Sequence, residues 1–118
     1  MIRPATESDR DAIWTVLEPM IRAGETYPLP RDMTCESALA YWFSPGHDVF
    51  VAEHDSAIAG TYFLKANQKG GGSHVANCGY VVAAQSAARG IGRAMCEDSL
   101  RRAKARLRLP PKARPARL

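Results

Sequence analysis

The chain has 118 residues, 46% of them hydrophobic and 24% charged, which allows one packed domain of ordinary globular composition. No apolar run approaches the roughly 20 residues of a membrane helix, and the first residues lack a signal peptide's apolar core, so a cytoplasmic protein without a membrane partner is predicted. Residues 1–100 hold 8 Lys and Arg against 12 Asp and Glu, whereas residues 101–118 hold 8 basic and no acidic residues. The net charge of +4 therefore belongs to the C-terminal end, which argues against a specific nucleic-acid-binding domain.

Three cysteines, Cys35, Cys78 and Cys96, are scattered along the chain without a spacing that would hold a metal ion. We interpret them as small buried side chains in a reducing compartment, and no metal is predicted. A reactive thiol is the less favoured alternative, because nothing in the sequence places a base beside any of them.

The pattern of apolar residues predicts a strand, two helices, three strands and a final helix, over residues 2–5, 7–22, 35–43, 48–53, 58–66, 74–83 and from 90 onward. Thr6 and Asp9 have the spacing of a capping box at the start of the first helix. Pro19 is expected to kink or split that helix, and Gly24 to end it. Gly60 is expected to mark a bulge or a close packing contact.

A strand, a short loop and a helix start meet at Gly90 and Gly92. Such a turn presents backbone amides to an anion, and the helix dipole adds positive potential there. Glycine at both positions removes the Cβ atoms that would hold phosphate groups away. A P-loop would need Lys-Ser or Lys-Thr after the second glycine, and a Rossmann fingerprint a third glycine, so neither fits. A plain strand-to-helix connection is the alternative interpretation.

Val81-Val82-Ala83-Ala84, followed after a short gap by Arg89-Gly90-Ile91-Gly92-Arg93-Ala94-Met95, resembles the acetyl-CoA-binding motif of the GCN5-related N-acetyltransferases. The segments at 2–6, 49–53 and 58–61 resemble the N-terminal half of the same family, so the resemblance covers about residues 1–105. The family places Gln or Arg at the position of Ala87, and this departure implies weaker binding.

The resemblance implies that acetyl-CoA is the cosubstrate. Backbone amides from Ala88 to Arg93 would hold its pyrophosphate, and the backbone of the preceding strand would hydrogen-bond its pantetheine arm. The implied cofactor-binding residues are Tyr80, Val81, Val82, Ala88, Arg89, Gly90, Ile91, Gly92 and Arg93.

The implied reaction is acetyl transfer to a primary amine, which is mostly protonated at neutral pH and therefore needs a base or a water chain. Candidates on the last predicted strand are His74, Asn77 and Tyr80. His74 has a suitable intrinsic pKa, but a lone His at the start of a strand is more often a surface residue. Asn77 could orient a water, or it could simply be a bulge or turn residue. Glu25 and Tyr27 lie in the loop where this family commonly contacts the acceptor, although a solvated surface explains them as well.

The fold expected from the resemblance is α/β with a mixed sheet in the order β-α-α-β-β-β-α. The family continues with a strand, a helix and two strands, and residues 106–118 show no such pattern, so we expect a truncated domain over 1–105 and a disordered basic tail over 106–118. The last strand would then lack one neighbour, which predicts a homodimer or a strand-exchanged oligomer.

Three functions are compatible with this sequence. The leading one is an N-acetyltransferase acting on a small-molecule amine, impaired by the truncation. The second is a silent acyl-CoA-binding or dimerising remnant. The third, nucleic-acid binding through the basic tail, would be salt-sensitive and non-specific.

Overall fold

The computed structural model describes residues 1–24, 30–66, 76–83 and 90–107. In chain order the elements are β1 (Ile2–Pro4), the 3-10 helix η1 (Glu7–Asp9), α1 (Arg10–Ala23), α2 (Cys35–Trp42), β2 (His47–His54), β3 (Ala57–Ala66), β4 (Ala76–Val82) and α3 (Ile91–Leu107). The predicted order of a strand, two helices, three strands and a helix is confirmed. None of the described helices is long and apolar enough to cross a membrane.

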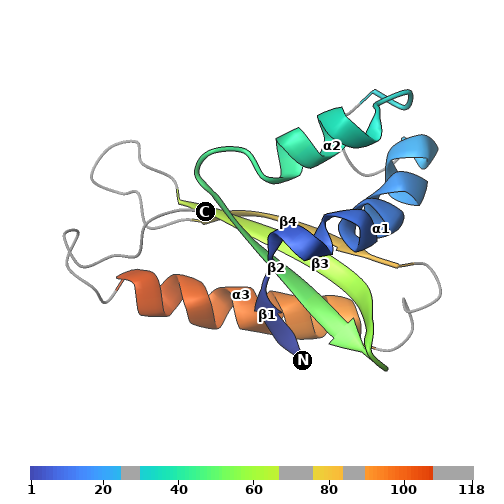
Figure 1. Ribbon diagram of the computed structural model, residues 1–118. Coiled ribbons are helices and arrows are strands. Elements are labelled where there is room, and N and C mark those ends of the chain that lie inside the picture. The colour runs from blue at the N-terminus through green and yellow to red at the C-terminus, as the bar shows by residue number, and fades with distance from the viewer. Residues whose placement is uncertain (25–29, 67–75, 84–89, 108–118) are drawn as a thin grey trace.

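The described strands form one sheet in the order β1-β2-β3-β4, and each neighbouring pair is antiparallel. Helices α1 and α2 cover one face of this sheet, and α3 covers the other (Figure 1). The prediction of a mixed sheet differs from this arrangement. A parallel neighbour of β4 would have to follow α3, and residues 108–118 lie outside the described residues.

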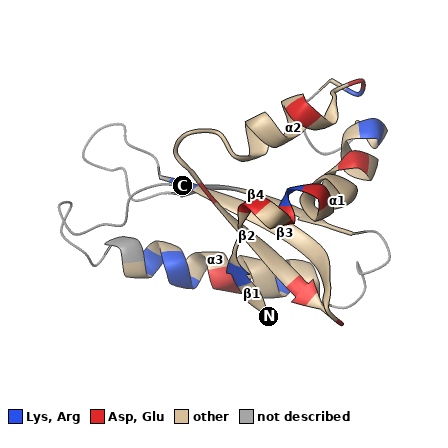
Figure 2. Cartoon of the chain, in the orientation of Figure 1, with Lys and Arg blue, Asp and Glu red and all other residues tan. Residues whose placement is uncertain are grey.

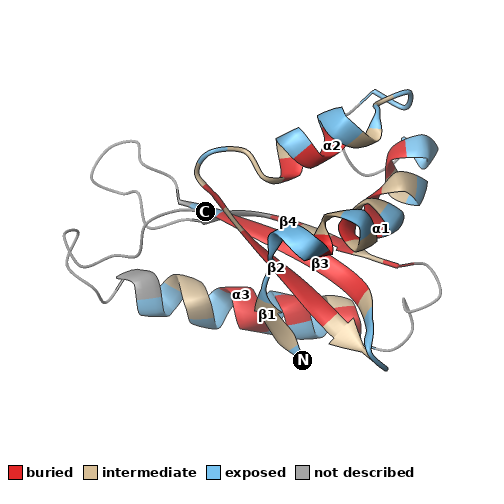
Figure 3. Ribbon diagram, in the orientation of Figure 1, coloured by how far each residue is buried: buried red, intermediate tan, exposed pale blue. Residues whose placement is uncertain are grey.

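The sheet is a buried middle layer because helices pack on both of its faces (Figure 3). Successive side chains of a strand point to opposite faces. Val49 and Val51 of β2 therefore pack with α1 and α2, while Phe50 and Ala52 pack with α3. On the α1–α2 side, the Trp42 indole N–H donates to the Thr61 hydroxyl at 3.1 Å, so its polar group is satisfied in the core.

The first predicted helix consists of two parts, η1 and α1. Of the two outcomes expected at Pro19, a split does not occur, because α1 runs through Pro19 to Ala23. Pro19 and Thr15, whose carbonyl loses its N–H partner, are both exposed, so water can hydrate that carbonyl. Gly24 ends the helix in the left-handed conformation with φ 67°, as predicted.

The hairpin between β2 and β3 has a two-residue turn at Asp55 and Ser56, both with positive φ, and this matches the strand twist. Beyond the turn, the register shifts between Ala52 and Glu53, so that β3 holds one extra residue beside Gly60. The bulge and the close packing contact expected around Gly60 are thus both present, and the contact is described with the site below.

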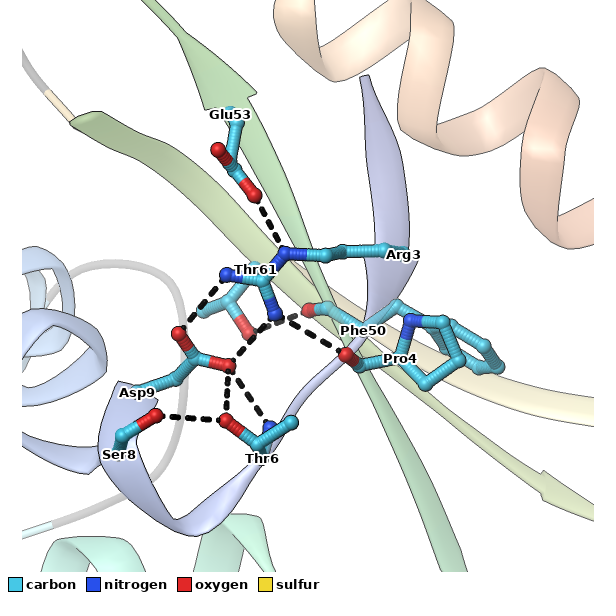
Figure 4. A network of polar contacts seen from close by, with 8 residues as sticks. All are labelled: Arg3, Pro4, Thr6, Ser8, Asp9, Phe50, Glu53 and Thr61. Carbon is cyan, nitrogen blue, oxygen red and sulfur yellow. Dashed lines mark hydrogen bonds and ion pairs between the residues drawn. The ribbon is translucent and has the colours of Figure 1, made fainter. Parts of the chain in front are cut away.

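An ion-pair network ties the start of the chain to the sheet (Figure 4). Arg3 of β1 donates two hydrogen bonds to the Asp9 carboxylate, at 2.8 and 2.9 Å, and its third nitrogen pairs with Glu53 of β2. The Asp9 carboxylate also accepts the Thr6 N–H at 2.7 Å, which is one half of the predicted capping box. The hydrogen bonds from Arg3 hold the pKa of Asp9 well below its ordinary value.

Replacing Arg3 by methionine is expected to lower the free energy of unfolding by about 2 kcal/mol at neutral pH, because buried Asp9 loses its bidentate partner. Asp has a pKa of about 3.9 in an unfolded chain, and that of folded Asp9 is lower. The stabilisation is therefore complete above about pH 4 and is lost as the pH falls through the folded pKa. Urea unfolding should show the wild-type and Arg3→Met stabilities converging towards about pH 2, and a constant difference would contradict the prediction.

Candidate active site

The backbone of β4 alternates between groups that bond to β3 and groups that face its outer edge, the side away from β3. The Ala83 N–H donates to the Ala59 carbonyl at 2.8 Å, and the register then makes Val81 and Thr61 a hydrogen-bonded pair of the same kind. Tyr80 and Val82 occupy the alternate positions, so their N–H and C=O groups face the outer edge. No other described strand lies on this edge.

The start of α3 lies just beyond the end of β4 along the chain. Gly90 adopts the left-handed conformation with φ 73°, which favours glycine. The Ala94 N–H donates to the Gly90 carbonyl at 3.0 Å, so the amides of Ile91, Gly92 and Arg93 precede the first bond of the helix. Among the described residues, none has an atom within 4 Å of the position that a Cβ on Gly90 would take, so these residues leave space beside the amides.

In the described part of this turn, positive charge comes from the helix dipole and from Arg93. The Arg93 side chain is 87% exposed and donates to Glu97 one turn along the helix at 3.1 Å, so its charge is shared with a surface carboxylate. Backbone amides are therefore the main donors that the described part of the turn offers to an anion.

Two tyrosines of the sheet bind consecutive residues of α3. The hydroxyl of Tyr62 in β3 donates to the Asp98 carboxylate at 2.5 Å, and the hydroxyl of Tyr80 in β4 lies 2.6 Å from Ser99 Oγ. The two rings are cross-strand neighbours that meet edge to face at 5.7 Å. Four hydroxyl and carboxyl groups thus lie between the sheet and the middle of α3.

Asp98 is buried, and it is the only carboxylate in this group. It accepts from Arg101 at 2.7 Å and from Arg102 at 2.7 Å, within the basic second half of α3 (Figure 2). Burial alone would raise the pKa of Asp98, but hydrogen bonds from Tyr62 and Arg102 outweigh it and hold the pKa below its ordinary value. Burial and the neighbouring carboxylate raise the pKa of Tyr62 well above its ordinary value, so Tyr62 remains a donor.

The first two turns of α3 approach the sheet closely at Gly60. A Cβ there would lie 3.0 Å from Met95 Cε, 3.1 Å from the Val81 carbonyl oxygen and 3.2 Å from Ile91 Cγ2. Gly92 contacts the sheet less tightly, since its Cβ would lie 3.5 Å from Val82. Gly60 thus allows α3 to pack near the end of β4.

The family model described as the acetyltransferase (GNAT) family matches residues 13–114. This chain belongs to the GNAT family. N-acetyltransferase aca1 of Schizosaccharomyces pombe is 30% identical over an alignment that covers 62% of this chain and 43% of the relative.

Two solved GNAT structures have the same fold as this chain. A GCN5-related N-acetyltransferase from Kribbella flavida is 32% identical with a TM-score of 0.78, over 89% of this chain and 65% of that one. A phosphinothricin acetyltransferase from Sinorhizobium meliloti, in complex with acetyl-CoA, is 18% identical with a TM-score of 0.74, over 90% of this chain and 60% of that one. This GNAT chain therefore spans less than two thirds of the length of these relatives.

The structure brings part of the expected cofactor site together. Tyr80, Val81 and Val82 lie in β4, and Gly90 is followed by the first turn of α3, with Ile91, Gly92 and Arg93. The three β4 residues differ in the direction of their backbone groups. Those of Val81 face β3, whereas those of Tyr80 and Val82 face the outer edge. The expected site residues Ala88 and Arg89, and the departure at Ala87, lie outside the described residues.

The predicted catalytic and acceptor residues are placed less completely. His74, Glu25 and Tyr27 lie outside the described residues. Asn77 lies in β4 and pairs with Lys65 of β3, but its side chain falls outside the described part of the chain. The Tyr80 side chain points to α3, the side of the sheet opposite α1 and α2.

The apolar pattern of the last helix predicts one buried face made of Met95, Cys96, Ser99, Leu100, Ala103 and Leu107, and only part of this face is buried in the structure. Met95 and Ser99 are buried as expected, but Cys96 and Leu100 are exposed, so the interpretation of Cys96 as a buried side chain is wrong. Asp98 takes a buried position instead, because Tyr62 donates to it from the sheet. Reasoning from the sequence missed this role, since an Asp three and four residues before arginines reads as a surface ion pair.

Replacing Gly60 by valine is expected to lower the free energy of unfolding by about 2 kcal/mol, because the side chain would press against Met95 and the Val81 carbonyl. Valine favours strands, so propensity alone predicts the opposite sign. Thermal and urea unfolding of Gly60→Val show whether its stability falls, as packing predicts, or rises, as strand propensity predicts. A Met95→Ala change in the Gly60→Val background should recover part of the loss, and full additivity of the two changes would contradict the packing argument.

Proposed function

We propose that this GNAT chain binds acetyl-CoA along the outer edge of β4 and at the start of α3, and transfers its acetyl group to a primary amine of a small molecule. The observation that carries the proposal is the direction of the Tyr80 and Val82 backbone groups, on a strand that leads into the amides of Ile91, Gly92 and Arg93. The name of the yeast relative and the acetyl-CoA complex of the Sinorhizobium structure support it.

The donors and acceptors of this chain fit the two polar parts of acetyl-CoA. The pantetheine arm carries amide groups, and Tyr80 and Val82 each direct one N–H and one C=O to the outer edge, as for an added strand. The pyrophosphate is an anion, and the helix start offers it backbone amides and the positive end of the dipole beside Gly90, where the described residues leave space. Acetyl-CoA supplies the activated acetyl group as a thioester.

Proton transfer is the remaining requirement, since a primary amine with a pKa of about 10 must lose a proton before it attacks. His74 and Asn77 remain the candidates for moving this proton or orienting a water. The Tyr80 hydroxyl is a weaker candidate, because its hydrogen bond to Ser99 directs it to the α3 side of the sheet. Glu25 and Tyr27 remain the proposed contacts to the acceptor.

Calorimetric titration with acetyl-CoA, followed by thiol release in the presence of a panel of small amines, tests this function. We expect saturable binding and release of thiol with at least one amine. An absence of binding would contradict the proposal. Binding without thiol release would favour the alternative, a chain that binds acyl-CoA but does not catalyse transfer. Sedimentation of the same sample tests the predicted homodimer, which stays a prediction.

A further inference from the structure

Tyr80 links the two elements that carry the proposed cofactor site, β4 and α3. Its backbone N–H and C=O face the outer edge of β4, where the pantetheine arm would bind. Its side chain points to α3, where the Tyr80 hydroxyl lies 2.6 Å from Ser99 Oγ. Ser99 lies eight residues, or about 12 Å, along the helix from Ile91, whose amide belongs to the proposed pyrophosphate site.

The hydrogen bond between Tyr80 and Ser99 has a defined direction. Ser99 Oγ donates its single hydrogen to the Cys96 carbonyl at 2.7 Å. The Tyr80 hydroxyl must therefore donate to Ser99 Oγ. Removing the Tyr80 oxygen alone deletes this bond, leaves Ser99 bonded to its own helix and keeps the ring, which meets Tyr62 edge to face.

Tyr62 offers an internal comparison. Its hydroxyl also binds α3, through Asp98, and it lies directly across from Tyr80 in the sheet. The hydrogen-bond alternation directs its backbone groups to Phe50 of β2. Tyr62 therefore anchors the helix without contributing a group to the outer edge of β4.

We propose that Tyr80 is a positioning residue for acetyl-CoA, and that its bond to Ser99 sets the offset between the β4 edge and the start of α3. The inference rests on the proposed function. One acetyl-CoA molecule gains from binding at two places only if both are held at the separation that its covalent structure requires. A helix that shifts along the sheet would still bind the nucleotide part but would lose the contribution of the arm.

The test compares two ligands on the same variants. The first ligand is acetyl-CoA, and the second is the phosphoadenosine diphosphate half of coenzyme A, which carries the pyrophosphate but no pantetheine arm. The ratio of the nucleotide Kd to the acetyl-CoA Kd measures the contribution of the arm. An unfolded fraction weakens both ligands equally, so a purely structural loss does not change this ratio.

In Tyr80→Phe the ratio is expected to fall about fivefold, the effect of one hydrogen bond. Ser99→Ala, which deletes the same bond from the other side, should give the same fall, and the double variant no further one. Tyr62→Phe is the matched control and should keep the ratio within about twofold even though it lowers stability.

The outcomes separate the two proposals. An unchanged ratio in Tyr80→Phe, with acetyl-CoA bound by the wild type, overturns the positioning role alone. An equal fall in Tyr62→Phe also overturns it, because any loosening of α3 would then suffice. Failure of the wild type to bind acetyl-CoA overturns the proposed function together with this inference.

Discussion

Replacing Asp98 by alanine is expected to lower the free energy of unfolding by about 3 kcal/mol, the largest stability loss that we predict for one side chain. The Asp98 carboxylate is buried and accepts from Tyr62, Arg101 and Arg102. The two arginines are partly exposed and can turn to water. The Tyr62 hydroxyl is fully buried and would lose its acceptor, which costs about 1–3 kcal/mol by itself.

This effect is measured by urea unfolding of the Asp98→Ala variant, with the Glu97→Ala variant as the control. Glu97 is the neighbouring acid on the same helix, but its pair with Arg93 is exposed, so its loss should change stability by less than about 0.5 kcal/mol. Adding Tyr62→Phe to Asp98→Ala should recover stability, because it removes the orphaned hydroxyl. Equal effects of the two single variants would show that the buried carboxylate does not anchor α3.

Replacing Gly92 by aspartate is expected to weaken acetyl-CoA binding at least a hundredfold, by about 3 kcal/mol or more. The carboxylate would stand among the amides proposed for the pyrophosphate. Two unit charges about 4 Å apart repel by about 4 kcal/mol near a protein surface. The fold should persist, because a Cβ at Gly92 makes only an ordinary contact with Val82 and because an acid is favourable at a helix start.

Gly92→Asn is the matched control for charge, since it has the same shape as the aspartate without its charge. We expect a much smaller loss of affinity in Gly92→Asn, and thermal unfolding should show both variants folded. Calorimetry with acetyl-CoA provides the comparison. Equal losses in the two variants would mean that space rather than charge limits the site, and unchanged affinity in both would exclude this turn as the pyrophosphate site.

The order of elements was predictable because it depends on local signals. Gly24 ends α1 in a left-handed conformation that few other residues adopt, and Thr6 with Asp9 marks the start of η1. Pro19 shows where a local signal fails: the helix continues, because the freed carbonyl lies at an exposed position. Propensity states the cost of proline but not whether solvent can offset it.

The sequence by itself determined the family resemblance and the glycine turn of the candidate site, because both depend on residue types at fixed spacing. It could not determine which backbone groups of β4 face the outer edge, since that depends on the pairing of β4 with β3. The inward face that it indicated for α3 is right at Met95 and Ser99 but wrong at Cys96 and Leu100. It also missed Asp98, which is buried where a hydroxyl from β3 donates to it. The Tyr80–Ser99 contact has the same origin: two residues far apart in the chain meet only when the helix packs on the sheet.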